Sequence, residues 1–120
     1  MGHLLVHVTS GPEDPTRAAM GFLVARHAAE DGHRVSLLLA ADAVQLVREA
    51  VLESLTGLGT GSLRESFDGL VDAGAQIYLS AMSSKARGVT EIHLEGKPAE
   101  FVLPSQLVAL TFEADRVLCY

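Results

Sequence analysis

The stretch Leu4–Ala18, which reads LLVHVTSGPEDPTRA, constrains the fold more than any other part of the chain. Its first half, LLVHVT, is apolar on both faces of a strand except for His7, which is typical of a parallel strand covered on both sides. In the loop that follows, Asp14 can cap a helix and Pro15 suits the first helical position. Because ligands in open α/β sheets bind beyond the carboxyl ends of the strands, this loop is the first candidate wall of a site.

The rest of the chain continues the alternation of strand and helix. We expect helices at 15–31, 43–55, 63–73 and 104–114, and strands at 34–40, 76–80 and 116–120. Residues 81–88 read as a loop with at most one helical turn, and 90–100 as a short helix or a loop, while a short strand at 100–103 would raise the strand count from four to five. The pattern predicts a single domain, 1–120, of the α/β class, with three α/β/α layers around a mostly parallel, flavodoxin-like sheet.

Composition narrows the functional classes. The formal net charge is −6 and there is no basic tract, which disfavours nucleic acid and anionic membranes as partners. The single cysteine excludes an internal disulfide, and the N-terminus shows no signal peptide, so we expect a cytoplasmic protein. A hydrophobic fraction of 48% without a long apolar run suggests that apolar surface is buried between subunits of a homo-oligomer.

Two patterns that resemble cofactor or metal sites do not fit on inspection. The segment GLGTG lacks the spacing of a nucleotide-binding loop and reads as a flexible turn before a helix capped by Ser62. His3 and His7 lie four residues apart on one strand, which is ~13 Å and too far for one ion. We therefore expect neither a cofactor nor a metal, and interpret the histidines as packing or surface residues.

The strongest polar cluster follows the strand 76–80. Hydroxyl groups and two cations within one loop suit an anion such as phosphate, carboxylate or a sulfur oxyanion. The alternative is a solvated loop whose cations pair with Glu91, Glu95 or a neighbouring subunit. Together with the first loop and 41–43, this segment forms the predicted edge of a site. The candidate ligand-binding residues are Ser10, Gly11, Pro12, Ser80, Met82, Ser83, Ser84, Lys85 and Arg87.

Several segments, spread over nearly the whole chain, carry a family resemblance. They are HVTSGPEDPTRAAMGFLVA, LLLAADAVQLV, GLGTGSLRE, YLSAMSSKARG and EADRVLCY. In these the sequence resembles the DsrE/DsrF-like family, which includes YchN-like and TusD-like proteins. The resemblance implies a three-layer domain with a parallel sheet, usually assembled into trimers or hexamers. It also implies a role in sulfur relay, in which a cysteine carries a persulfide.

The sequence departs from this family at the residue that matters most. The sulfur-carrying cysteine of the family lies in the loop after the strand that corresponds to QIYLS, and here that region, 80–84, reads SAMSS. A hydroxyl cannot hold a persulfide, and serine is far less acidic than a thiol. We therefore expect an accessory protein without enzymatic activity, which binds a small anionic or sulfur-bearing ligand or a sulfur-relay partner protein.

Two alternatives stay open. Cys119, on the last strand, could act as a displaced sulfur carrier if that strand runs parallel to the others. Its other interpretation is a small buried hydrophobic residue, which is how most lone cysteines behave. The remaining alternative is a purely structural subunit of an assembly, with a vestigial pocket.

Overall fold

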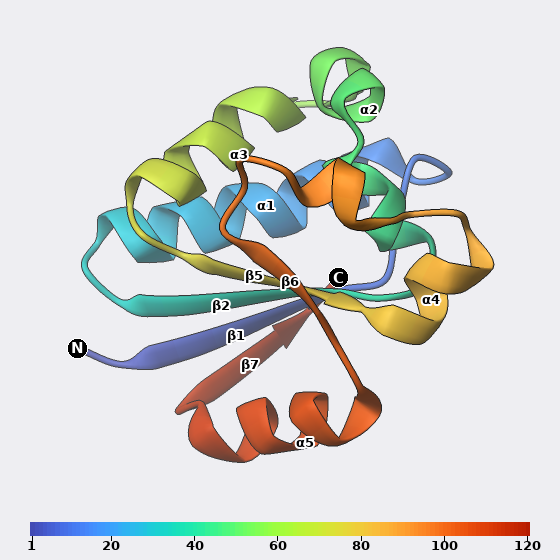
Figure 1. Ribbon diagram of the computed structural model, residues 1–120. Helices are drawn as coiled ribbons and strands as arrows, with labels where there is room; N and C mark the ends of the chain where they lie inside the picture. The colour runs from blue at the N-terminus through green and yellow to red at the C-terminus, as the bar shows by residue number, and fades with distance from the viewer.

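The computed structural model describes residues 1–120 and has a five-stranded sheet with helices on both faces (Figure 1). This confirms the predicted three-layer α/β/α fold. The strands of the sheet are β1 (His3–Val8), β2 (Arg34–Leu39), β5 (Gln76–Ser80), β6 (Ala99–Val102) and β7 (Arg116–Cys119). The helices are α1 (Pro15–Glu30), α2 (Glu49–Ser54), α3 (Leu63–Asp72), α4 (Ala81–Ala86) and α5 (Pro104–Glu113), with two 3-10 helices, η1 (Ala41–Val47) and η2 (Glu91–Leu94).

All pairs in the sheet are parallel, and the strand order is β6-β5-β2-β1-β7. The order differs from the 2-1-3-4-5 order of flavodoxin itself, while the layers and the parallel sense are those predicted. From β1 the chain adds β2, β5 and β6 on one side and then returns to place β7 on the other. The topological switch point therefore lies between β1 and β7. In such sheets this is a preferred place for ligands.

The larger core fills the layer between the sheet and helices α1 and α3. It is a cluster of 24 buried residues, and the predicted apolar stripe of α1, Ala18, Phe22, Ala25 and Ala29, belongs to it. The ring of Phe22 stacks on Phe67 of α3 with centroids 6.5 Å apart. The caps of these helices also form as predicted, because Asp14 accepts the Arg17 N–H and Ser62 accepts the Glu65 N–H.

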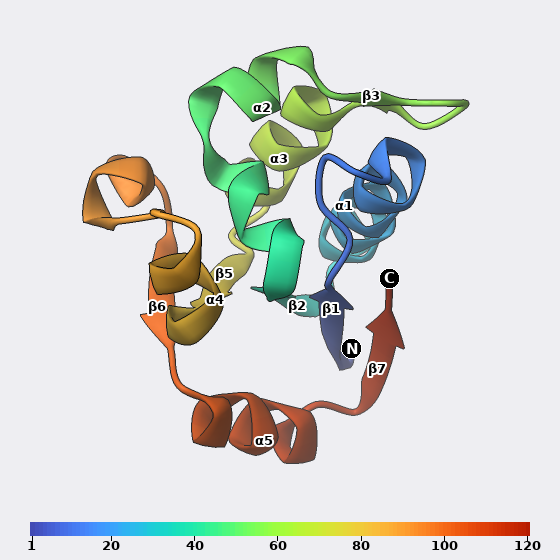
Figure 2. The ribbon, with the colours of Figure 1, turned by 90° about the vertical axis from the view of Figure 1, so that its right-hand side faces the viewer.

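The opposite face of the sheet is covered by α5 alone (Figure 2). Its core is a cluster of four buried residues, Leu5, Leu38, Val102 and Leu110. Leu110 is the only buried residue of α5. The two layers are thus very unequal, and much of the second face is left to polar or exposed side chains.

Two predicted elements differ in the structure. The helix expected at 43–55 is divided into η1 and α2 at Arg48, which has extended backbone angles, and Asp42 caps neither part. The guanidinium of Arg48 contacts the His93 ring and donates to the Arg87 carbonyl, so a tertiary contact interrupts the helix. The segment GLGTG contains the turn expected before the helix capped by Ser62, but two short strands that the pattern does not predict flank this turn. It forms the tip of a hairpin of β3 (Thr56–Gly57) and β4 (Gly61–Ser62), packed against α1 so closely that a Cβ on Gly57 would lie 2.9 Å from the Thr16 Cα.

Two less regular segments acquire definite structure. The expected loop 81–88 contains α4, with Ser80 as its N-cap, and 90–100 contains η2 followed by β6. No helix of the structure has the length and hydropathy that a membrane span requires.

Candidate functional site

The carboxyl ends of the parallel strands meet along one edge, which we call the rim. It consists of residues 9–14, 40–43, 80–87 and the end of β7 at Cys119 and Tyr120. The Thr9 N–H donates to the Tyr120 carbonyl at 2.8 Å, and the Ala41 N–H donates to the Ser83 hydroxyl at 2.9 Å. Three predicted wall segments, 10–15, 41–43 and 80–87, are therefore brought together as the strand directions require.

The first loop is locked against the end of β2. Gly11 is buried, and a Cβ built on it would overlap the Asp42 carbonyl oxygen. The Gly11 N–H donates to both carboxylate oxygens of Glu13, at 2.8 and 3.1 Å. Pro12 is exposed, and Ser10 is half-buried. Gly11 thus has a structural reason to lack a side chain, which is the close approach of two loops.

Three of the predicted ligand-binding residues make hydrogen bonds that hold the rim together. The Ser80 hydroxyl accepts the Ser83 N–H at 3.1 Å and caps α4. The Ser83 hydroxyl in turn accepts the Ala41 N–H. The Arg87 guanidinium donates to Asp42 at 3.0 Å and to the Ser83 carbonyl at 3.2 Å. Arg87 therefore pairs with Asp42 rather than with Glu91 or Glu95, and it is not a free cation for an anion.

The other members of the same cluster point elsewhere because the segment is helical. Residues three and four apart share a side of a helix, so Ser84 and Lys85 lie on the side of Ala81, whereas Ser83 is turned toward Ala41. Ser84 and Lys85 line a separate cavity beside β6, and Met82 is exposed. The structure thus divides the predicted cluster into two groups on different sides of α4.

The backbone at the end of β2 is strained. Ala41 has a φ of +52°, and it is the only non-glycine residue with a positive φ. Such conformations persist only where the surroundings hold them, and they gather at functional sites. Here the bond from the Ala41 N–H to Ser83 holds the conformation in place.

A small apolar cavity opens beside Ser80 at the rim. It has a volume of about 80 Å³ and lies over the ends of β2, β5 and β6, under the start of α5. Its lining residues are Leu38, Ala40, Ser80, Val102, Leu103, Pro104 and Leu107. The Ser80 hydroxyl accepts one N–H, and its own proton has no acceptor in the protein. The cavity therefore combines apolar walls with one available donor.

Cys119 lies at the carboxyl end of β7, at the topological switch point. Because β7 runs parallel to β1, its carboxyl end lies at the same edge of the sheet, and Cys119 is therefore part of the rim. The thiol belongs to an exposed residue, so the interpretation as a buried hydrophobic residue is wrong. The residue also borders a cavity of about 390 Å³ on the side of α1, which is lined by Asp14, Thr16, Arg17, Met20, Cys119 and Tyr120.

His7 is the registered neighbour of Cys119 on β1. Registered residues of parallel strands share a face, which here is the one that Leu5 and α5 occupy. The His7 Nε2 atom is buried and has no hydrogen-bond partner. Burial lowers the pKa of His7 below its ordinary value, which favours the neutral imidazole.

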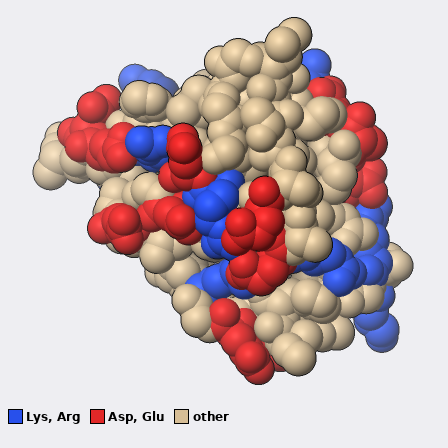
Figure 3. Space-filling view, turned by 90° about the horizontal axis from the view of Figure 1, so that it is seen from above, with Lys and Arg blue, Asp and Glu red and all other residues tan.

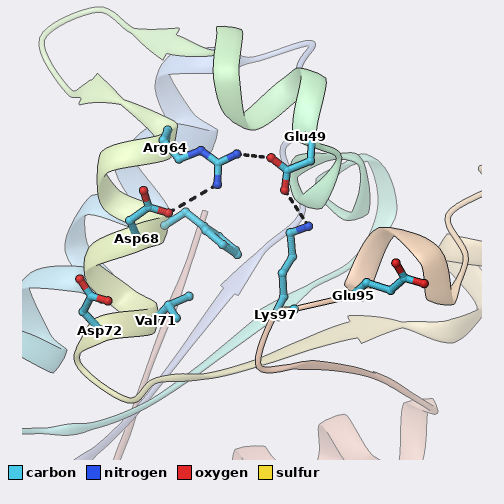
Figure 4. A pocket seen from close by; sticks show the side chains of 9 residues that line it. Glu49, Arg64, Asp68, Val71, Asp72, Glu95 and Lys97 are labelled. Carbon is cyan, nitrogen blue, oxygen red and sulfur yellow. Dashed lines mark hydrogen bonds and ion pairs between the residues drawn. The ribbon is translucent and has the colours of Figure 1, made fainter.

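A third group of polar residues lies away from the rim, between α2, α3 and the turn before β6 (Figure 4). Glu49 bridges Lys97, at 2.9 Å, and Arg64, which also reaches Glu53 and Asp68. The Lys97 and Arg64 bonds lower the pKa of Glu49. Acidic and basic side chains alternate on this face (Figure 3). The network borders a cavity of about 330 Å³, but its charges satisfy one another, so we interpret it as a clamp between elements.

No local sequence pattern indicates this clamp, because its members come from three separate segments of the chain. For metals, the structure brings together no group of three or more His, Cys, Asp or Glu side chains that could hold an ion.

Comparison with known proteins agrees with the fold. The sequence model of the DsrE/DsrF-like family matches residues 3–120. The chain belongs to the DsrE/DsrF-like family. The crystal structure of the YchN protein from E. coli is similar, with a TM-score of 0.79, 16% identity and complete coverage of both chains. A conserved protein of unknown function from Bacteroides thetaiotaomicron, BT1422, has a TM-score of 0.71 and 14% identity, over 99% of this chain and 95% of the other. No curated protein matches the sequence.

As a DsrE/DsrF-like protein, the chain is related to sulfur relay proteins. Identities of 14–16% to the solved structures support the fold alone. In this DsrE/DsrF-like chain the strand β5 ends in Ser80, and no cysteine lies in 80–84. The usual relay residue is therefore absent from the place where the family resemblance puts it.

We predict that Gly11→Ala destabilises the protein by about 1–3 kcal/mol, because the added methyl group must displace the backbone of Asp42. Urea unfolding measures the loss. Gly2→Ala is the matched control, since its Cβ would meet only the Asp115 side chain, at 3.3 Å, and it should be nearly neutral. Equal stability of the two variants would show that the first loop is not locked against β2.

Proposed function

We propose that this protein is an accessory member of a sulfur relay, which binds a terminal sulfur group at the Ser80 cavity without accepting it covalently. The observation that carries the proposal is the position of this cavity. It lies at the end of β5, in the region where the resemblance places the sulfur-carrying cysteine, and Ser80 contributes its one hydroxyl. The ligand class that fits is a thiol or persulfide sulfur presented by a small molecule or a partner protein.

The size and chemistry of the cavity favour sulfur over a charged oxyanion. A water molecule occupies about 30 Å³ in the liquid, so about 80 Å³ accommodates a group of two or three heavy atoms. Sulfur is polarisable and accepts only weak hydrogen bonds, which suits apolar walls such as Leu38, Val102 and Leu107. No free cation lines the cavity, and Arg87 is already paired with Asp42.

Serine at this position limits the protein to binding. A hydroxyl is too weakly acidic to act as the nucleophile that a thiolate is, and it forms no persulfide. The protein therefore holds or shields the sulfur, and another component of the relay carries out the transfer.

A thiol placed at this position tests the geometry. In a Cys119→Ser background, we expect the Ser80→Cys variant to take one sulfur atom from glutathione persulfide. Mass spectrometry measures the gain in mass over time. Ser54→Cys on α2 is the control, because Ser54 is more exposed than Ser80 but adjoins no cavity. Positioning of the donor sulfur should make the reaction at residue 80 at least about ten-fold faster.

The two thiols separate binding from simple exposure. If Ser54→Cys reacts as fast as Ser80→Cys or faster, accessibility alone sets the rate and the cavity does not bind the donor sulfur. That outcome would overturn the proposed site.

A second candidate function is sulfur transfer by Cys119, which its exposure and its place at the switch point favour. The Cys119 thiolate attacks the terminal sulfur of a donor persulfide, R–S–SH. A bond forms between Sγ and that sulfur, the donor S–S bond breaks, and its electron pair leaves with RS⁻. The proton stays on the transferred sulfur, so the product is the Cys119 persulfide and there is no net oxidation.

The proton of the Cys119 thiol needs an acceptor, and His7 supplies one. Its Nε2 atom has no partner, burial keeps its imidazole neutral, and it lies in register with Cys119 on the next strand. The registered neighbour of His7 on the other side is Leu38, which does not ionise.

We predict that the unaltered protein gains one sulfur from glutathione persulfide and that Cys119→Ser does not. His7→Gln should slow the transfer at neutral pH and approach the rate of the unaltered protein in alkaline solution, where hydroxide replaces the imidazole as the proton acceptor. Intact-mass measurements over a pH series report both effects. An unchanged mass of the unaltered protein would remove this candidate.

We also propose that the protein assembles into a homo-oligomer through the outer face of α5. Phe112 is 88% exposed, and Leu103 and Val108 are more than half exposed. No charged residue occurs in α5 before Glu113. Two copies of an acidic chain meet with least repulsion at such an uncharged apolar face. A purely structural role is what remains if assembly occurs and neither sulfur experiment succeeds.

Phe112→Asp should shift the protein from an oligomer to a folded monomer, because a carboxylate is costly to bury in an apolar interface. Sedimentation velocity measures the mass, and circular dichroism checks the fold. Ile92→Asp places the same charge at an exposed apolar residue of η2 and should leave the oligomer intact. A monomeric unaltered protein, or equal effects of both variants, would contradict assembly through α5.

A further inference from the structure

A cavity of about 300 Å³ lies on the side of α4 that faces β6, away from the rim contacts that Ser83 and Arg87 make with the end of β2. It is formed by α4, the turn that follows it, and β6. Its lining residues are Ala81, Ser84, Lys85, Gly88, Val89, Thr90 and Phe101. The volume is at the lower end of the range for small-molecule pockets. Neither the rim contacts nor the proposed sulfur site uses these side chains.

Ser84 is the buried polar residue of this cavity. It is 2% exposed, and its hydroxyl has no hydrogen-bond partner in the protein. Buried hydroxyl groups are nearly always hydrogen-bonded, so an unpaired one needs an explanation. A ligand that supplies the missing partner is such an explanation, since Ser84 is one of the residues that line the cavity.

Lys85 provides the charge. It is exposed and takes part in no salt bridge, in contrast to Arg87 on the same segment and to Lys97, which pairs with Glu49. Its ammonium group is therefore a free cation beside the cavity. Thr90, also exposed, adds a second hydroxyl to the lining.

We propose that this cavity binds a small organic anion that joins one carboxylate to a compact apolar body. The apolar body packs against Ala81, Val89 and Phe101. The carboxylate lies at Lys85, and it accepts the hydroxyl proton of Ser84. Inorganic phosphate and sulfate fit less well, because one cation and mostly apolar walls do not compensate for removing a dianion from water.

Three probes separate the parts of this proposal. Benzoate carries both the charge and the apolar body, benzyl alcohol has the body without the charge, and acetate has the charge with almost no body. We expect benzoate to bind at least about ten-fold more tightly than either, since both contributions are needed. Each probe is titrated into the protein, and the NMR signals that shift, expected to be those of Val89, Phe101 and their neighbours, locate the site. Equal affinities of benzoate and benzyl alcohol, or shifts elsewhere, would overturn it.

Lys85→Gln should weaken benzoate binding about ten-fold and leave benzyl alcohol unaffected, because it removes only the charge. Arg17→Gln, at an exposed cation beside the cavity of about 390 Å³, is the control and should not change benzoate binding. If the two variants weaken benzoate equally, the attraction is one of general charge and the cavity is not the site.

Ser84→Ala gives an independent test of the hydroxyl. Because the hydroxyl is unpaired in the free protein, the alanine variant should be as stable as the unaltered protein or more stable, while binding benzoate several-fold more weakly. A loss of stability in the free variant would mean that the hydroxyl already has a partner, and unchanged benzoate affinity would mean that it has no role in binding. Either result would contradict the assignment of Ser84.

Discussion

The parallel pairing of β1 with β2 is the constraint on which the rest of the structure depends. The two strands are in register over six pairs, from His3 with Arg34 to Val8 with Leu39. Because both strands point the same way, the loops that leave them emerge side by side, and Gly11 comes against the backbone of Asp42. The same geometry brings α4 to Ala41, where one hydroxyl holds the only left-handed non-glycine residue. The rim is therefore a direct consequence of strand direction.

The two faces of the sheet carry cores of very different size, and this difference explains where side chains remain exposed or without hydrogen-bond partners. One face of the sheet supports 24 core residues under α1 and α3, and the other supports four under α5. A single ten-residue helix cannot cover five strands, so the second face keeps the Ser80 cavity, the unpaired His7 nitrogen and the exposed Cys119. Both sulfur candidates thus arise from one feature of the fold.

The segment 80–87 shows how a helix separates residues that are adjacent in the sequence. On a loop, three serines and two cations would form one anion site. On α4 the same residues serve two sides. Ser83 and Arg87 hold the rim to β2, whereas Ser84 and Lys85 border a cavity beside β6. Hydrogen bonds that cap and anchor a helix use the same hydroxyl groups that a ligand would need, which is why a polar cluster alone is a weak guide to a site.

The sequence by itself determined the strands, most helices, their caps and the parallel sheet, because buried strands and capped helices leave local patterns of apolar residues and breakers. It also placed the candidate loops at one edge, since strand direction follows from the alternation of strand and helix. The tertiary structure alone decided the strand order, the break at Arg48, the pairing of Arg87 with Asp42 and the clamp around Glu49. Each of these features depends on contacts between residues that are distant in the sequence. The energies of these contacts exceed local conformational preferences, and the contacts produce no periodic pattern in the sequence.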